Sequence, residues 1–171
     1  FGADDAESAW EREGSPIVVE HEYGTKRIEI EKVVLHQGDG VATDTFETCG
    51  TMVMDLHWKA DEPVDDPIFG YSLKRINGEH LFGTNTDIVG LPLGTLQGRG
   101  VIQVRFDPVT FWDARYALSI AVHSRDHSEQ FHRVEDRYRF TVRRPEFGAG
   151  EGTFYFDGAW SLPAGGDKSE S

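Results

Sequence analysis

Several alternating segments of this sequence carry histidine, glutamine or arginine on the face opposite their apolar residues. Imidazole, amide and guanidinium groups form hydrogen bonds with hydroxyls, and aromatic rings stack on the apolar faces of sugars. Polar side chains of this kind beside aromatic rings therefore indicate carbohydrate binding. The candidate carbohydrate-binding residues are His57, Tyr71, Gln103, Arg105, His123 and Arg139. For each of them taken singly, the alternative is a solvated cross-strand partner that binds no ligand.

Catalytic signatures are nearly absent from the sequence. It contains no phosphate loop, no dinucleotide-binding glycine pattern, no nucleophile elbow and no H-E-x-x-H. Carboxylate pairs such as Asp65-Asp66 and Glu135-Asp136 are present, and a glycosidase needs two carboxyls that face each other across a sugar. No pattern places any pair in that way, so we interpret them as solvated faces and turn caps. We expect no catalytic residue and no cofactor.

One histidine-rich region raises the alternative of a metal site. His123, His127 and His132 lie close to Asp126 and Glu129. Their spacings of four and five residues do not fit neighbouring positions on one strand face, and a metal site needs convergent ligands. A solvated hairpin loop is the favoured interpretation, and we expect no metal.

The composition excludes several classes of partner. With Lys+Arg at 17 and Asp+Glu at 30, the net charge is −13, which disfavours nucleic acid and anionic lipid as ligands. The sequence contains no run of eighteen apolar residues, which a membrane-spanning helix would need. Its acidic start, FGADDAESAWEREGSP, does not have the pattern of a signal peptide. Cys49 is the single cysteine, so neither an internal disulfide nor a cysteine-based zinc site can form.

The elements that must position these residues are short strands. Segment 26–35 changes phase between Ile30 and Val33, which indicates a bulge. One apolar face per strand predicts an all-β fold in which two antiparallel sheets form a β-sandwich. We expect residues 1–24 to be an acidic linker or arm, 25–161 the sandwich and 162–171 a flexible tail. Eight segments alternate with period two between turn residues: 26–35, 51–59, 67–76, 80–84, 100–106, 115–123, 136–143 and 152–160.

One hairpin carries a more specific pattern, PIFGYSLKRINGEHLFGTNT. Asn77-Gly78 predicts a tight reversal. Pro67, Phe69-Gly70, Gly78 and the FGTNT run at 82–86 resemble, in order, the signature hairpin of the C-terminal domain of Wzt, the nucleotide-binding subunit of ABC transporters that export O-antigen polysaccharides.

Other segments support this resemblance over residues 25–161. RYALSIAV and FHRVEDRYRFTV are similar to strands of that family, and Gly152 and Trp160 stand where it has a glycine and a closing tryptophan. ETCG at 47–50 departs slightly, because family members often have a glycine followed by a polar residue there. For FGTNT itself, a structural role at the hairpin exit is favoured over direct sugar contact.

The resemblance implies both a fold and a function. The fold is an immunoglobulin-like β-sandwich of about eight strands that binds a lipid-linked polysaccharide in the cytoplasm, at the inner face of the membrane. The implied partners are this glycan, the transporter's ATPase domain and membrane subunit, and a second copy, which can dimerise by exchange of the last strand. ATPase activity would belong to another domain, joined through 1–24, so this domain is expected not to be an enzyme.

The glycan contacts in this family vary with the glycan, so the six candidate residues rest on the outward-face interpretation alone. Two other function classes stay open at the level of sequence. One is a structural β-sandwich that dimerises or spaces the ATPases without binding sugar. The other is a sugar-modifying enzyme, which would need a catalytic carboxylate pair.

Overall fold

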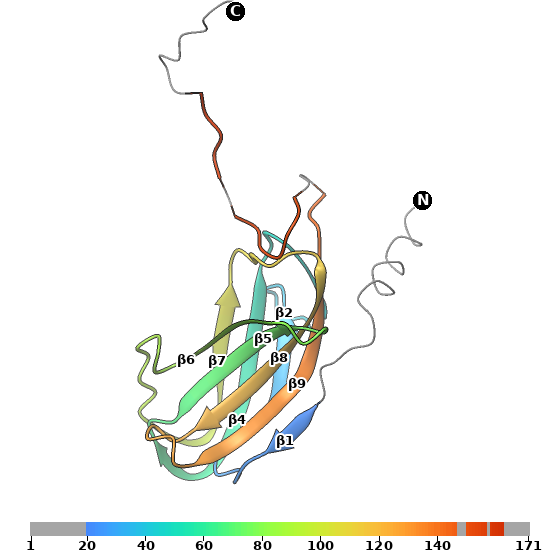
Figure 1. Cartoon of the computed structure of the whole chain (residues 1–171). Coiled ribbons are helices and arrows are strands. Elements are labelled where there is room, and N and C mark those ends of the chain that lie inside the picture. Colours follow the sequence, from blue (N-terminus) through green and yellow to red (C-terminus); the bar gives the residue numbers. More distant parts are fainter. Residues whose placement is uncertain (1–19, 147–149, 157, 163–171) are drawn as a thin grey trace, which may run out of the picture.

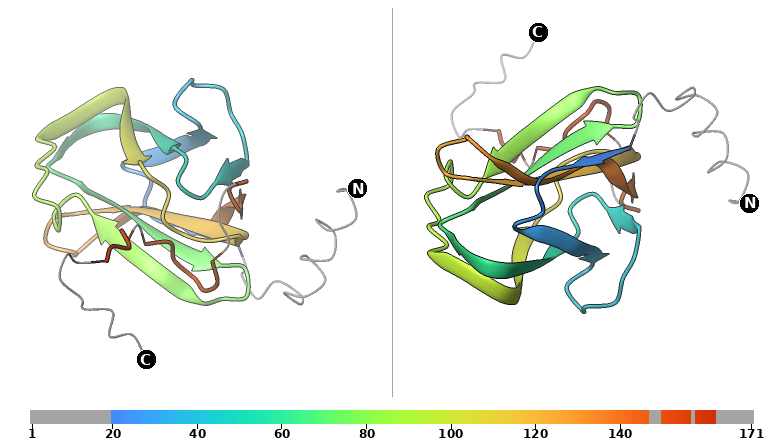
Figure 2. Two further views of the ribbon diagram at one scale, coloured as in Figure 1. Left: turned by 90° about the horizontal axis from the view of Figure 1, so that it is seen from above. Right: turned by 90° about the horizontal axis from the view of Figure 1, so that it is seen from below.

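Two antiparallel β-sheets stacked face to face form the body of the protein (Figures 1 and 2). The structure is a computed structural model, and it describes residues 20–146, 150–156 and 158–162. Within these residues there are nine strands and no helix, and hence no helix that could cross a membrane. The strands are β1 (His21–Tyr23), β2 (Glu29–His36), β3 (Thr45–Glu47), β4 (Met52–Asp65), β5 (Ile68–Arg75), β6 (His80–Asn85), β7 (Thr95–Phe106), β8 (Ala114–His123) and β9 (Gln130–Arg143).

The larger sheet has the order β1-β9-β8-β5-β6, and β3 pairs with β9. β1 runs antiparallel along one half of β9 and β3 runs parallel along the other half. The second sheet has the order β2-β4-β7. We call these the large sheet and the small sheet. The predicted all-β, antiparallel β-sandwich is thus confirmed.

The core fills the space between the two sheets. Alternate residues of β4 and β8 point inward and are almost fully buried, as expected for strands with one apolar face. An aromatic cluster closes one end of this core, where Tyr116 stacks on Phe140 at a centroid distance of 5.5 Å and Phe111 meets both rings edge-on. The two sheets therefore pack together through their inner faces, and their outer faces point away from this core.

Several local predictions are confirmed. The register of β2 against β4 shifts between Ile30 and Lys32, as the phase change indicated. The β5–β6 hairpin turns at Gly78, whose φ of +93° suits glycine, and the backbone of Arg75 bonds Glu79 across the turn. Seven of the predicted segments therefore correspond to observed strands: β2 and β5 are shorter than predicted, and β4, β6, β7, β8 and β9 are longer.

The expected strand over 152–160 does not form in the described part of that range. Phe154 makes one isolated bridge with Phe111, and the Tyr155 ring stacks on Trp112 with centroids 6.0 Å apart. A strand needs a partner edge along its length, but beyond this bridge the segment leaves the body of the sandwich (Figure 1). By contrast, β1 lies within the expected arm 1–24 and pairs with β9; residues 1–19 and 163–171 lie outside the described residues.

Candidate functional site

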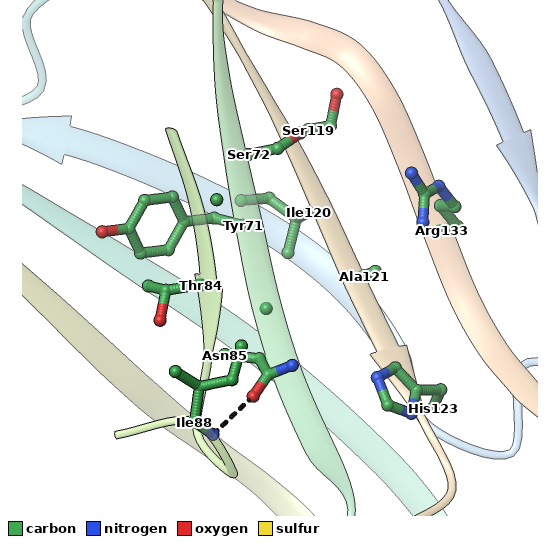
Figure 3. Close-up of a pocket in the computed structure, with 12 residues that line it drawn as sticks. Tyr71, Ser72, Thr84, Asn85, Ile88, Ser119, Ile120, Ala121, His123 and Arg133 are labelled. Atoms are coloured by element: carbon green, nitrogen blue, oxygen red, sulfur yellow. Dashed lines mark hydrogen bonds between the residues drawn. The ribbon is translucent and has the colours of Figure 1, made fainter. Parts of the chain in front are cut away.

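A groove lies on the outer face of the large sheet, over β5, β6, β8 and β9 (Figure 3). Its volume is about 250 Å³. Its floor consists of residues with small side chains, so the backbone of the sheet is close to the surface. The floor residues are Gly70, Ser72, Gly83, Ser119 and Ala121.

The strand register brings these residues together. Gly70 of β5 lies opposite Asn85 of β6 on one side and Ala121 of β8 on the other, and Ala121 lies opposite Arg133 of β9. Directly opposed residues of antiparallel strands point to the same face. The result is a row across four strands that has two small residues in the middle and a polar side chain at each end.

The two walls of the groove carry hydrogen-bonding groups. On one side, Asn85 Oδ1 accepts a bond from the Ile88 amide at 2.8 Å, and within the described residues the Asn85 amide nitrogen has no partner. On the other side, Arg133 Nε donates to Glu135 at 2.7 Å, and the His123 ring bonds the Ser124 carbonyl at 2.8 Å. Figure 3 shows Arg133 and His123 along one wall and Asn85 with Ile88 at the other.

A buried polar cluster supports one end of the floor. Ser119 Oγ donates to Asp136 Oδ1 at 2.9 Å and accepts from the Asp136 amide at 2.9 Å, while Lys74 Nζ donates to Asp136 Oδ2 at 3.2 Å. The register of β8 against β9 shifts here, and Asp136 has a φ of +52°. This bulge turns Asp136 toward β8 and fixes the position of Ser119.

A salt-bridge clamp fixes the loop after β6. Arg125 donates to Asp66 at 2.7 Å and to Asp87 at 3.0 Å, and Asp66 also accepts from the Leu93 amide at 3.0 Å. The Leu93 amide and the Arg125 guanidinium together hold the pKa of Asp66 below its ordinary value. The loop that carries Ile88 is thereby held against the end of the groove.

The six candidate residues of the sequence analysis do not share one site, although Tyr71, Gln103 and Arg105 all line a second hollow, described below. His57, Gln103 and Arg105 share the outer face of the small sheet. There Gln103 bonds Asp55 at 2.8 Å and Arg105 bonds Asp107 at 2.9 Å, so these polar groups already have partners in the protein.

The other three candidates belong to the large sheet. Tyr71 faces the interior, where its ring meets Phe106 edge-on at 5.6 Å, and burial raises the pKa of its phenol. Arg139 lies on the outer face, opposite Ala117, and its Nε bonds the Asp136 carbonyl at 3.4 Å. Two of the six candidates, Tyr71 and His123, line the groove.

The histidine-rich region does not converge on a common point. The rings of His123 and His127 stack with centroids 4.5 Å apart. His132 is buried, and its ring bonds the Ile30 amide at 2.9 Å and Glu22 at 3.0 Å. Across the described ranges, no group of three or more His, Cys, Asp or Glu residues could hold a metal ion.

A second hollow lies on the inner side of the same hairpin, between the edges of β6 and β7. We call it the slot; its volume is about 270 Å³. Figure 3 shows Tyr71 and Thr84 turned away from the groove wall formed by Arg133 and His123. Most of the residues that line the slot are apolar, including Phe69, Tyr71, Val89, Leu91, Ile102 and Val104.

The FGTNT run separates these two hollows. Gly83 and Asn85 line the groove, whereas Thr86 faces the opposite side, where its Oγ accepts from the Phe69 amide at 3.2 Å. The Thr86 amide in turn donates to the Phe69 carbonyl at 2.9 Å. The run therefore has the expected clamping role at the hairpin exit and also forms one groove wall.

Comparisons with known proteins agree with this architecture. The family model described as the Wzt C-terminal domain matches residues 19–157. The crystal structure of the C-terminal domain of wzt is similar, with a TM-score of 0.70 at 15% identity, covering 86% of this chain and 91% of that chain. A β-glucuronidase from Parabacteroides merdae is also similar in part, with a TM-score of 0.42 at 13% identity over 68% of this chain and 14% of that chain. A search of curated proteins finds no match.

Proposed function

The chain belongs to the Wzt C-terminal domain family, and from this premise we propose that it binds a polysaccharide in the groove of the large sheet. The observation that carries the proposal is the row from Asn85 to Arg133, in which small residues expose the sheet between two polar ends. A floor of this kind admits a flat sugar ring close to the backbone. The Asn85 amide and the Arg133 guanidinium then lie in position to bond its hydroxyls.

The proposed ligand is the lipid-linked glycan of an O-antigen type polysaccharide. In this role the domain recognises the glycan on the cytoplasmic side of the membrane and delivers it to the ABC exporter through the transporter's ATPase domain and membrane subunit. The domain contributes binding and no chemistry. The catalytic signatures missing from the sequence support this division of labour.

We also propose that the domain forms a homodimer by exchange of its last segment. Phe156 is 84% exposed and Trp160 fully exposed on a segment that extends from the body (Figure 1). Exposed apolar residues of this kind mark interaction surfaces, and the apolar slot offers an open edge between β6 and β7. A purely structural, dimerising module is the second candidate function, and the same segment favours it.

Calorimetric titration separates the two functions. The folded domain is titrated with the O-polysaccharide of its source organism and with an unrelated glycan. We expect saturable binding to the first and none to the second. A folded domain that binds neither glycan would contradict the binding function and leave the structural one.

Matched variants on the two outer faces locate the site. Arg133→Ala removes a groove wall, and we expect it to weaken binding about tenfold, the scale of one lost charged hydrogen bond. Arg105→Ala makes the same change on the small sheet, and we expect it to leave the affinity unchanged. Weaker binding in Arg105→Ala with unchanged binding in Arg133→Ala would place the site at His57, Gln103 and Arg105 instead.

A further inference from the structure

The row that crosses the groove continues onto a fifth strand. Tyr23 of β1 lies directly opposite Arg133 of β9, so the complete row is Asn85, Gly70, Ala121, Arg133 and Tyr23. Neighbouring strands lie about 4.8 Å apart, so the two ends of the row are separated by roughly 19 Å. This length exceeds that of a single sugar ring.

Tyr23 is presented on the surface at the far end of this row. It is 48% exposed, and within the described residues its hydroxyl has no hydrogen-bond partner. Successive residues of a strand point to opposite faces, so Tyr23 shares the outer face with Arg133 while Glu22 points the other way. An exposed aromatic ring with a free hydroxyl can both stack on a sugar and bond it.

Glu22 anchors β1 from the opposite face. Its carboxylate accepts hydrogen bonds from Lys26 at 3.0 Å and from the buried His132 at 3.0 Å, and it forms a salt bridge with Arg137 at 2.7 Å. Three partners from two different parts of the chain thus converge on one side chain. β1 has three residues, and this anchor supplements its short ladder of backbone bonds.

The chain after Tyr23 is fixed just as closely. Gly24 has a φ of +136°, and a Cβ there would lie 2.4 Å from the Phe131 carbonyl oxygen, so glycine alone fits. The Thr25 amide then bonds the Gln130 carbonyl at 3.1 Å. The backbone of Tyr23 is therefore held in place before any ligand arrives, which reduces the entropic cost of binding.

We propose that Tyr23 is an aromatic subsite that extends the groove into a track for an oligosaccharide, with Glu22 as its positioning residue. The inference rests on the proposed glycan-binding function and adds to it a selectivity for chain length. A short fragment occupies the groove between Asn85 and Arg133, and a longer one also reaches the ring on β1.

Fragments of the native O-polysaccharide test the proposal. The protein is titrated with a fragment of one repeating unit and with a fragment of several. We expect Tyr23→Ala to weaken binding of the long fragment about five- to tenfold and of the short fragment less than about twofold. Tyr23→Phe, which keeps the ring, is expected to stay within about twofold of the wild type for both fragments.

Two further variants distinguish a sugar subsite at Tyr23 from a general effect of removing an exposed aromatic side chain. Glu22→Ala is expected to reproduce the length-dependent loss, whereas Phe82→Ala, a control of similar exposure at 52%, is expected to leave both affinities unchanged. The subsite would be overturned if the wild type binds both fragments and Tyr23→Ala either loses the same affinity for both or loses none. A wild-type protein that binds neither fragment would overturn the glycan-binding function itself.

Discussion

At the scale of single residues, buried polar groups fix the shape of the groove. Asp136 is 5% exposed and bonds both Ser119 and Lys74. A buried polar group that loses its partner incurs the full cost of desolvation. The floor near Ser119 therefore depends on a side chain that does not itself face the groove.

Removing this carboxylate is expected to destabilise the fold. Asp136→Ala leaves Ser119 and Lys74 without their partner and places alanine at a φ of +52°, so we expect a loss of about 2–4 kcal/mol in the free energy of unfolding. Asp136→Asn keeps a partner for Ser119 and tolerates positive φ, so its loss is expected to be smaller. Urea denaturation measures both, and wild-type stability in Asp136→Ala would contradict the assigned role.

Glu22 predicts a dependence of stability on pH. Hydrogen bonds from Lys26, Arg137 and His132 lower its pKa from 4.5 to about 2. Because the pKa is lower in the folded state, Glu22 contributes its stabilisation above pH 4.5, and this contribution is lost as the pH falls from 4.5 toward 2.

The matched variant is Glu22→Gln. Denaturation of both proteins at a series of pH values is expected to show a smaller difference between them at the acid end of that window than at pH 6. A stability difference that stays constant across the window would show that the Glu22 charge does not stabilise the fold.

At the scale of elements, the groove is a property of strand register. Gly70, Ala121 and Arg133 lie in different strands and meet because each pair is directly opposed. A larger side chain in the middle of the row is therefore expected to block the ligand without disturbing the packing of the core.

Ala121→Leu places a large side chain on the groove floor. We expect binding of the native polysaccharide to fall by more than about tenfold, because the added atoms occupy the space of the sugar. We expect the melting temperature to stay within a few degrees, since Ala121 faces outward. Val101→Leu on the outer face of the small sheet is the control, and undiminished binding in Ala121→Leu would move the site away from this floor.

The strands could be predicted from the sequence, but the groove could not. Alternation identified β4, β5 and β8, because a strand with one buried face must alternate. β1 and β3 have three residues each, too few to show a period. The floor residues Gly70, Ser119 and Ala121 are small and carry no chemical signal, and their meeting depends on long-range pairing that one sequence does not reveal.

The candidate binding residues likewise show that alternation predicts the face of a strand but not the site on the folded protein. His57, Gln103 and Arg105 were each expected on the outward face of their strand, and the structure has them there, because alternation within a strand sets the face. Alternation does not tell which sheet that face belongs to, nor that neighbours such as Asp55 already bond its polar groups. Arg133 was missed because β9 begins six residues before the predicted strand at 136, at Gln130.

At the scale of the whole molecule, exposed apolar residues lie both beside the slot and on the last segment. Phe156 is exposed in the single chain, as are Val89 and Leu91 beside the slot. Burying one set against the other in a second copy would remove both from water, at about 25 cal/mol per Å² of apolar area. This arrangement fits the proposed exchange of the last segment.

Light scattering after size-exclusion chromatography tests the exchange. We expect the wild type to have twice the chain mass and Phe156→Asp to have the mass of one chain, because the substitution would place a charge against the apolar residues of the slot, such as Val89 and Leu91. Val41→Asp, in the β2–β3 loop, is the control and is expected to remain dimeric. A monomeric wild type, or a dimeric Phe156→Asp, would contradict the exchange.

The most direct test of the central claim is an NMR titration of the labelled domain with its native O-polysaccharide. We expect the amide shifts that change with saturation to cluster on the outer face of the large sheet, at Gly70, Ser72, Ala121 and Arg133. Shifts confined to His57, Gln103 and Arg105 on the small sheet, or no saturable shift at all, would contradict the groove as the glycan-binding site.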